Sequence, residues 1–372
     1  MQEVYLCLDV GGTEIKAAPL DKRGNFLAPV RHFPAMAGAD RQTLLENFGW
    51  IFSSICPENA VPIEIDLAFP GPFDYKNGIC LLQGLDKYDA LYGCNLRRAF
   101  SEISGLPEQR IQFINDAAAF ALGEMTFGQA TQAGRALFVA VGTGCGSAFG
   151  VNGFLAEEGT PGVPPNGYFY NAPFRDSCVD DYISRRGLEK LSGEMLGVPL
   201  DGRALAERIA AGDERAKACF RCFGEQLCDA LQPQIEAFCP DTLCMGGQIM
   251  ESAALFLHPL EKLCTNKKIT LYITQDTSLR TMQGLTRAPA GRHISICLYI
   301  WKNFSPWSTS NRNSSNIWIT TTTAESEQNE RACRLQFTDN KPFRLLEQFL
   351  LQNMALTFWD HLKTADVLLF IW

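Results

Sequence analysis

The sequence predicts an α/β protein built from two domains. Short apolar runs typical of strands alternate along the chain with segments of helical spacing, which is the pattern of layered α/β folds. Two of these strands end in glycine-rich turns of the same design. The length of 372 residues leaves room for two domains of about 150 residues each.

The individual elements follow from the apolar runs and from the residues that end them. The run over 4–8 is a strand that enters a tight turn at Gly11-Gly12, and a second strand over 15–19 completes a hairpin. The other expected elements are a helix over 41–56, a strand over 63–69 that stops at Pro70, a strand over 111–114, an alanine-rich helix over 117–124, strands over 136–141 and 147–151, helices over 203–211 and 213–231, and a strand over 242–245.

Composition and charge exclude several classes of protein. With 46% hydrophobic and 20% charged residues, the chain is neither disordered nor collagen-like nor a disulfide scaffold. The net charge is −8, and an acidic body argues against nucleic acid as the main partner. The 14 cysteines are scattered and the N-terminus lacks the basic start of a signal peptide, so we expect reduced thiols and a cytoplasmic location. No apolar run reaches about 18 residues, and we expect no membrane span.

The first glycine-rich turn has the composition of a phosphate site. Gly11 and Gly12 let backbone N–H groups approach an anion, Thr13 adds a hydroxyl donor, and Lys16 could reach a phosphate as a point charge. Asp9, at the end of the strand, could hold Mg²⁺ through water, because Mg²⁺ keeps part of its hydration shell. A plain Gly-Gly hairpin turn explains the same residues equally well.

The second turn repeats this design. Gly142, Thr143, Gly144 and Gly146 again separate an apolar strand from a second strand. Two such turns could hold one polyphosphate from both sides, and the pair is more specific than either turn alone. The pattern is neither a Walker A loop, since no Gly-Lys-Ser/Thr follows, nor a dinucleotide fingerprint, since a strand and not a helix comes next.

Asn115-Asp116 lies between the two turns, at the end of a strand. A carboxylate there is a good general base for deprotonating a hydroxyl, and the neighbouring amide can hydrogen-bond the same polyol. Asp116 as a helix N-cap is the alternative, and capping is compatible with catalysis. Gly246-Gly247, after a further strand, could approach an adenine or a ribose closely, or could simply form a tight turn.

Five motifs in order give the chain a resemblance to a known family. The motifs are Asp9-Val-Gly-Gly-Thr-Glu-Ile-Lys16, Pro70-Gly-Pro-Phe-Asp74, Asn115-Asp-Ala-Ala-Ala-Phe-Ala-Leu-Gly-Glu124, Gly142-Thr-Gly-Cys-Gly146 and Gly246-Gly247. Over roughly residues 3–288 the chain resembles the ROK family of sugar kinases and repressors. The resemblance implies two actin-like (ribonuclease H-like) α/β domains around a nucleotide and sugar cleft, with ATP and Mg²⁺ as cofactors.

The resemblance also implies roles for single residues. It makes Asp116 the catalytic base, residues 9–16 and 142–147 the phosphate loops, and Gly246-Gly247 the adenosine contact. Asn115, Gly71 and Asp180 are the residues expected to bind the sugar. The implied reaction is transfer of phosphate from ATP to a hexose, as in a glucokinase, with the 6-hydroxyl as the family's usual target.

The sugar pocket departs from the family pattern. Many members carry a Glu-x-x-His contact followed by a cysteine-rich zinc motif, whereas Tyr168 stands at the glutamate position here and no histidine follows. Cys178 is the only thiol nearby, and a zinc site needs three or four ligands, so we expect no zinc. Asp180 replaces a later family glutamate, or Asp181 does if the register shifts by one. The thiols at 219, 222, 228, 239 and 244 are expected to be buried and not metal ligands.

The domains are expected at residues 1–118 and 119–291, with an atypical tail over 292–372. All 31 glycines lie at or before Gly291, and five of the six tryptophans lie beyond it. Within the tail, residues 303–323 are expected to be a polar linker or disordered, and residues 343–362 carry a helical apolar stripe. A helix packed on the body, a partner-binding helix and a lost reading frame near residue 290 are three interpretations that stay open.

The expected function is that of a cytoplasmic ATP-dependent hexose kinase that forms a homodimer. A family repressor would carry a DNA-binding segment before the first phosphate loop, for which Asp9 leaves no room. A non-catalytic sugar-binding or regulatory protein is the second alternative, because the sugar-contacting glutamate and histidine are missing. The intact Asp116 and both phosphate loops favour the kinase.

Overall fold

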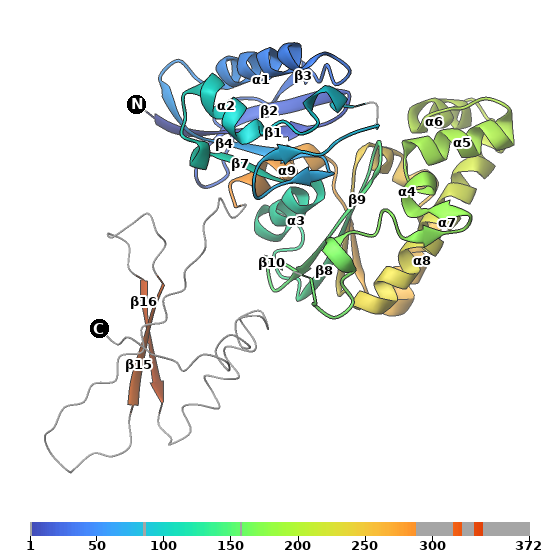
Figure 1. Ribbon diagram of the computed structural model, residues 1–372. Helices are drawn as coiled ribbons and strands as arrows, with labels where there is room; N and C mark the ends of the chain where they lie inside the picture. The colour runs from blue at the N-terminus through green and yellow to red at the C-terminus, as the bar shows by residue number, and fades with distance from the viewer. Residues whose placement is uncertain (1, 85–86, 157, 288–314, 322–330, 338–372) are drawn as a thin grey trace, which may run out of the picture. The chain divides into compact units, whose positions relative to one another are not determined.

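The computed structural model describes residues 2–84, 87–156, 158–287, 315–321 and 331–337. The chain divides into two compact units, residues 1–290 and 291–372, and each is described by itself. The first unit contains two sheets of five strands each (Figure 1). None of the helices in the described ranges is both long and apolar enough to cross a membrane.

The first sheet has the strand order β3-β2-β1-β4-β7. Its strands are β1 (Gln2–Val10), β2 (Glu14–Leu20), β3 (Arg31–Pro34), β4 (Ala60–Phe69) and β7 (Ile111–Asn115). β1, β2 and β3 form an antiparallel meander, and β4 and β7 add parallel strands beside β1.

The second sheet repeats this topology with the order β10-β9-β8-β13-β14. Its strands are β8 (Arg135–Val141), β9 (Cys145–Val151), β10 (Phe154–Leu155), β13 (Thr242–Gly246) and β14 (Thr270–Ile273). Again a meander is followed by two parallel strands. The β1–β2 turn and the β8–β9 turn, which are the two glycine-rich turns, therefore occupy equivalent places in the two sheets.

The helices cover both sheets on both faces. They are α1 (Arg41–Ile55), α2 (Leu96–Ser104), α3 (Asp116–Phe127), α4 (Val179–Tyr182), α5 (Arg185–Leu196), α6 (Gly202–Ala210), α7 (Glu214–Phe238), α8 (His258–Lys267) and α9 (Thr277–Leu285). Shorter elements are β5 (Phe73–Asp74), β6 (Ile79–Cys80), β11 (Pro173–Phe174), β12 (Ser177–Cys178), and the 3-10 turns η1 (Asp89–Leu91), η2 (Glu108–Arg110), η3 (Pro165–Gly167) and η4 (Gln248–Leu255).

The alternation of side chains along each strand explains how both faces of a sheet are buried. Along β8, Leu137 and Val139 belong to the core under α7, whereas Ala136 and Phe138 belong to the core under α3. A strand buried on both faces needs apolar residues at every position, which is why the strands read as continuous apolar runs.

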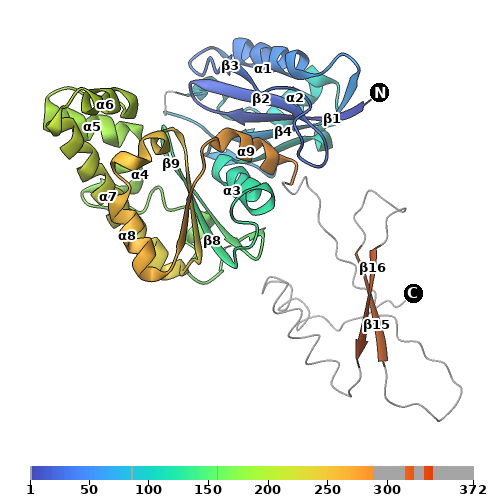
Figure 2. The same ribbon diagram turned by 180° about the vertical axis from the view of Figure 1, so that it is seen from behind.

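α3 and α9 occupy equivalent places in the two halves and pack against each other. α3 follows the last strand of the first sheet and α9 follows the last strand of the second. Figure 2 shows α9 beside α3 and against the first sheet, where Met282 and Leu285 share a core with Cys7 and Ala119. A Cβ on Gly123 would lie 1.9 Å from the Arg280 carbonyl oxygen, so the two helices approach at backbone distance.

The expected elements of the first unit are found, and one helix extends well beyond its expected end. The helix expected over 213–231 runs from Glu214 to Phe238 and contains Pro233. Ile235 and Phe238 continue the buried face of this helix, and their packing offsets the backbone hydrogen bond that proline removes.

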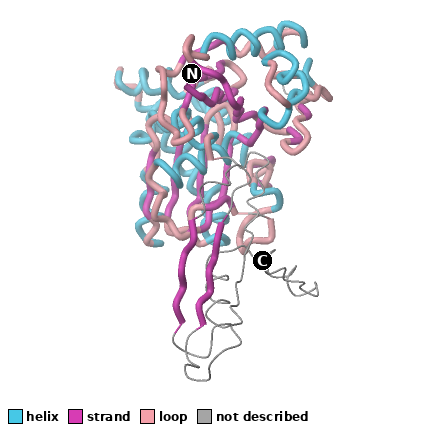
Figure 3. The backbone as a smooth tube through the Cα atoms, turned by 90° about the vertical axis from the view of Figure 1, so that its left-hand side faces the viewer, coloured by secondary structure: helices cyan, strands magenta, loops and turns pink. Residues whose placement is uncertain are grey.

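The second unit contains one described strand pair. β15 (Ser315–Thr321) pairs antiparallel with β16 (Arg331–Phe337), as the two neighbouring strands in Figure 3 show. The polar linker expected over 303–323 is thus wrong for residues 315–321, where isoleucine and threonine favour a strand. The helix expected over 343–362 lies outside the described residues.

Candidate active site

The first glycine-rich turn joins β1 to β2. The Gly11 N–H donates to the Glu14 carbonyl oxygen at 3.0 Å, which closes the turn. Asp9 lies just before it, opposite Lys16 in the antiparallel register. Burial raises the pKa of Asp9 to about 6; a hydrogen bond from Ser278 opposes this, the Asp116 carboxylate adds to it, and Lys16 opposes it. Asp9 is therefore a half-buried carboxylate within electrostatic range of Asp116.

The second turn is held by hydrogen bonds to residues of α4 and α5. The Gly142 N–H donates to the Gly144 carbonyl oxygen at 2.9 Å, and the Cys145 N–H donates to Asp180 Oδ1 at 2.6 Å. The Arg185 N–H donates to the Gly142 carbonyl oxygen at 2.8 Å. Thr143, at the tip, is exposed and available to a ligand.

Asp116 is the first residue of α3, and its neighbour Asn115 is the N-cap of this helix. Asn115 Oδ1 accepts from the Ala118 N–H at 3.1 Å, so the capping function that Asp116 could have had belongs to Asn115. Asp116 Oδ1 accepts from the Ala117 N–H at 2.9 Å. Burial raises the pKa of Asp116, while this N–H and the charge of Lys87 oppose the rise.

Close packing brings the second turn to Asp116 as well. A Cβ on Gly146 would lie 3.1 Å from Ala117 Cβ, so β9 begins directly beside the first turn of α3. Asp9, which precedes the first turn, is within electrostatic range of Asp116, so both glycine-rich turns converge on the N-terminus of α3. A helix N-terminus favours negative charge, both on a carboxylate and on a phosphate.

Two of the three predicted sugar-site residues, Asn115 and Gly71, lie beside Tyr75. Asn115 Nδ2 donates to the Tyr75 hydroxyl at 3.4 Å, and a Cβ on Gly71 would lie 3.5 Å from the same oxygen. Burial raises the pKa of Tyr75, and the nearby Asp116 carboxylate adds to the rise. Burial and then Asp116 likewise raise the pKa of Tyr168, so both phenols are neutral and within electrostatic range of the carboxylate.

Asp180 is tied to the second glycine-rich turn. One oxygen accepts from the Cys145 N–H, and the other pairs with Arg186. Its role as a sugar contact stays a prediction, and the alternative residue, Asp181, is exposed.

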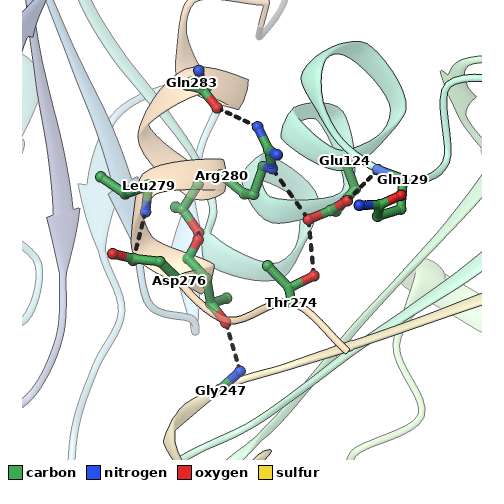
Figure 4. Close-up of polar contacts among 10 residues, drawn as sticks. Glu124, Gln129, Gly247, Thr274, Asp276, Leu279, Arg280 and Gln283 are labelled. Carbon is green, nitrogen blue, oxygen red and sulfur yellow. Dashed lines mark hydrogen bonds and ion pairs between the residues drawn. The ribbon is translucent and has the colours of Figure 1, made fainter. Parts of the chain in front are cut away.

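Gly246-Gly247 ends β13 and is fixed to the start of α9. The Gly247 N–H donates to Thr277 Oγ1 at 2.7 Å. This hydrogen bond is the dashed line at Gly247 in Figure 4. Gly247 has a φ of 94°, and a Cβ there would lie 2.3 Å from the Val141 carbonyl oxygen. Glycine is thus required by the fold at this position, whether or not a nucleotide lies against it.

Glu124 connects α3 to α9 beneath the site (Figure 4). It is 1% exposed and accepts hydrogen bonds from Thr274 Oγ1 and the Gln129 N–H, both at 2.8 Å. Arg280 Nε lies 3.4 Å from Glu124 Oε1. This buried network fixes α3 to α9. α3 begins at Asp116, and α9 begins at Thr277, which accepts the Gly247 N–H.

The donors suit a hard cation and an anion together. Asp9 offers carboxylate oxygens, the ligand type that Mg²⁺ prefers, and Mg²⁺ commonly takes one or two carboxylates together with waters and phosphate oxygens. Within the described ranges, no three His, Cys, Asp or Glu side chains are grouped closely enough to hold a metal ion.

The sequence analysis missed several residues of this site. Lys87, Tyr75 and Ser278 lie in no motif, and each enters the site from a different segment of the chain. In the structure Ser278 follows β14 and lies at the start of α9, much as Asp116 follows β7 and begins α3, but no strand was expected over 270–273.

The two equivalent sheets, with the helices that follow their last strands packed together, define the class of actin-like proteins with two α/β domains. A model of the ROK family matches residues 5–284, and the chain belongs to the ROK family. The resemblance seen in the five motifs is therefore confirmed.

Relatives and solved structures agree with this assignment. The chain is 26% identical over 261 residues to the N-acetyl-D-glucosamine kinase of Vibrio vulnificus, covering 66% of this chain and 84% of that protein. The ROK hexokinase from Thermus thermophilus is similar with a TM-score of 0.62 and 20% identity, over 76% of this chain and 96% of that one. A ROK glucokinase from Streptomyces griseus, in complex with glucose and AMPPNP, is similar with a TM-score of 0.59 and 20% identity. The match covers 76% of this chain and 98% of that one. The predicted actin-like fold is confirmed.

Proposed function

We propose that this chain is an ATP-dependent hexose kinase that transfers the γ-phosphate of ATP to the 6-hydroxyl of an aldohexose. The observation that carries the proposal is the place of Asp116, at the N-terminus of α3 where both glycine-rich turns converge. A carboxylate in that place can receive a proton from a hydroxyl while the phosphates of ATP lie against the turns.

In the proposed reaction, Asp116 accepts the proton of the sugar hydroxyl as the hydroxyl oxygen attacks the γ-phosphorus of ATP. The bond from this phosphorus to the β–γ bridging oxygen breaks, and ADP leaves. Burial raises the pKa of Asp116 and so makes it a stronger base, while the Ala117 N–H keeps the carboxylate oriented. Gly11, Gly12 and Thr13 bind phosphate from one side, and Gly142–Gly146 from the other. Catalysis then rests on positioning and charge neutralisation.

Asp9 is the proposed holder of Mg²⁺, through water. When bound, Mg²⁺ neutralises charge on the phosphates. Lys16 lies opposite Asp9 on β2, and its charge lowers the pKa of Asp9, which favours the ionised carboxylate. Gly246-Gly247 is the proposed adenosine contact.

The sugar is proposed to lie beside Tyr75 and Tyr168, with Asn115, Gly71 and Asp180 as its predicted contacts. The neutral phenol of Tyr168 can donate a hydrogen bond to a polyol, whereas the Tyr75 hydroxyl already donates to the Phe69 carbonyl oxygen at 2.9 Å. Both rings offer apolar area to the C–H face of a sugar. The similar proteins named above act on N-acetylglucosamine or glucose, or are named for hexoses, which supports a hexose substrate without selecting one.

Incubation with ATP, Mg²⁺ and a panel of hexoses tests the proposal. We expect ADP release to rise when the correct sugar is added, and ³¹P NMR to show a sugar 6-phosphate. Folded protein that binds a sugar but gives no stimulated ADP release with any of them would favour the non-catalytic alternative.

The remaining expectations stay predictions. They are a homodimer, a cytoplasmic location, the absence of nucleic acid as a partner, and domains at residues 1–118 and 119–291 with a separate tail. Because α9 packs on the first sheet, we propose that residues 277–285 complete the N-terminal domain and not the domain that precedes them in sequence.

A further inference from the structure

Lys87 lies along the first glycine-rich turn, although 75 positions separate it from Gly12 in the sequence. A Cβ placed on Gly12 would be 3.5 Å from Lys87 Cδ and 3.9 Å from Lys87 Cβ, so the aliphatic stem passes over the glycine at van der Waals distance. The side chain is half-buried. Its aliphatic stem thus lies against the turn that is proposed to bind phosphate.

The next residue, Tyr88, fixes this placement. The Tyr88 hydroxyl donates to the Gly11 carbonyl oxygen at 2.8 Å, and its N–H donates to the Ala37 carbonyl oxygen at 2.7 Å. The ring is fully buried among aromatic residues, with its centroid 5.5 Å from that of Phe69.

The backbone of Tyr88 is strained. Its φ of 57° and ψ of 19° lie in the left-handed region, which a bulky residue rarely adopts. Such conformations persist where the surroundings over-determine them, and they concentrate at functional sites. Here the strained residue is the one that holds Lys87 against the turn.

Lys87 also acts on Asp116. Its charge opposes the effect of burial on the pKa of Asp116, so the ammonium lies within electrostatic range of the proposed base. Lys16, the lysine that the motif indicates, lies opposite Asp9 and acts on that carboxylate instead. The two lysines therefore act on different carboxylates, and Lys87 is the one that both lies against the phosphate turn and acts on the proposed base.

We propose that Lys87 is a further catalytic residue, which neutralises the charge of the transferred terminal phosphate, and that Tyr88 is its positioning residue. This inference rests on the proposed function, because a phosphate that passes from the first turn toward the hydroxyl at Asp116 moves alongside Lys87. An ammonium acts there as a point charge on the phosphoryl oxygens.

The test uses Lys87→Met and Lys87→Arg, with Lys262→Met as a control on the exposed face of α8. We expect Lys87→Met to lower kcat about 100-fold or more while the hexose KM changes less than about threefold, and Lys87→Arg to restore part of the loss. Lys262→Met should match the unaltered protein. A kcat for Lys87→Met within about threefold of the unaltered value would overturn the proposal.

A second readout does not depend on the sugar. Calorimetry should show that Lys87→Met weakens binding of AMPPNP about tenfold and of ADP less than about twofold, because only AMPPNP has a terminal phosphate beside Lys87. Equal weakening of both nucleotides, or of neither, contradicts the proposal. If the unaltered protein phosphorylates no hexose, the proposed function fails, and this comparison alone decides the role of Lys87.

Tyr88→Phe separates positioning from folding. The ring stays buried while the hydrogen bond to Gly11 is lost, so we expect a folded protein with kcat lowered about three- to tenfold and the same preferential loss of AMPPNP affinity. A folded Tyr88→Phe variant with unchanged kcat and nucleotide affinities would exclude the positioning role.

Discussion

Asp180 Oδ1 accepts the backbone N–H of Cys145 at 2.6 Å, and the other oxygen of this carboxylate pairs with Arg186. A residue predicted as a sugar contact is thus the support of the second glycine-rich turn. A Cβ on Gly144 would lie only 2.8 Å from Asp180 Oδ1, so the turn and the carboxylate are closely packed.

Asp180→Ala should therefore raise the KM for ATP more than the KM for the hexose. Loss of the Cys145 partner leaves the turn less well positioned, and we expect a rise in the ATP KM of about tenfold or more. Steady-state kinetics with each substrate varied separately measure both constants, and Asp181→Ala is the matched control. A rise confined to the hexose KM would instead support direct sugar binding by Asp180.

Activity should fall as the pH falls through about 6. Burial raises the pKa of both Asp9 and Asp116, and the proposed mechanism needs both carboxylates ionised. Below the pKa of either group, kcat/KM should drop about tenfold per pH unit. The groups that face Asp9 are Lys16, Asp116, Asp276 and Ser278.

Lys16→Met sharpens the pH experiment. Lys16 lowers the pKa of Asp9, so its removal should move the acid limb of the kcat/KM profile to higher pH. A profile that stays flat down to pH 5 in the unaltered protein contradicts a requirement for these carboxylates.

Asp9→Asn should stabilise the ligand-free protein at pH 7. The pKa of Asp9 is raised from 3.8 to about 6, so its contribution to folding stability is complete below pH 3.8 and is lost as the pH rises through 6. At pH 7 the buried ionised form is unfavourable, and its removal should gain on the order of 2 kcal/mol in the free energy of unfolding. Urea unfolding at pH 7 and pH 4 measures this, and an equal gain at both pH values would show another cause.

Glu124→Leu should destabilise the first unit strongly. Loss of the buried carboxylate leaves Arg280, Thr274 and the Gln129 N–H without their partner, at a cost of about 3–5 kcal/mol. The control is Glu207→Ala, whose partner Arg203 is 89% exposed and whose loss should cost under about 1 kcal/mol. Similar unfolding free energies for the two variants would mean that the buried network contributes little.

The sequence predicted most of the strands and the turns that build the site, because their apolar runs end at glycine, at Pro70 or at Asn115-Asp116. It could not place α9, since helical periodicity identifies a buried face but not the sheet that covers it. It also passed over Lys87, because the fold and not the local sequence brings this residue to Gly12. The end of α7 was misplaced because tertiary packing beyond Pro233 outweighs the local helix-breaking effect of proline.

The most direct test of the account is hexose-stimulated ADP release by Asp116→Asn compared with the unaltered protein. Asp229→Asn, on the exposed side of α7, is the matched control. We predict that Asp116→Asn keeps its fold and its nucleotide affinity but loses about 1,000-fold or more in kcat, while Asp229→Asn is unchanged. Stimulated turnover that persists in a folded Asp116→Asn variant would contradict the assignment of Asp116 as the base.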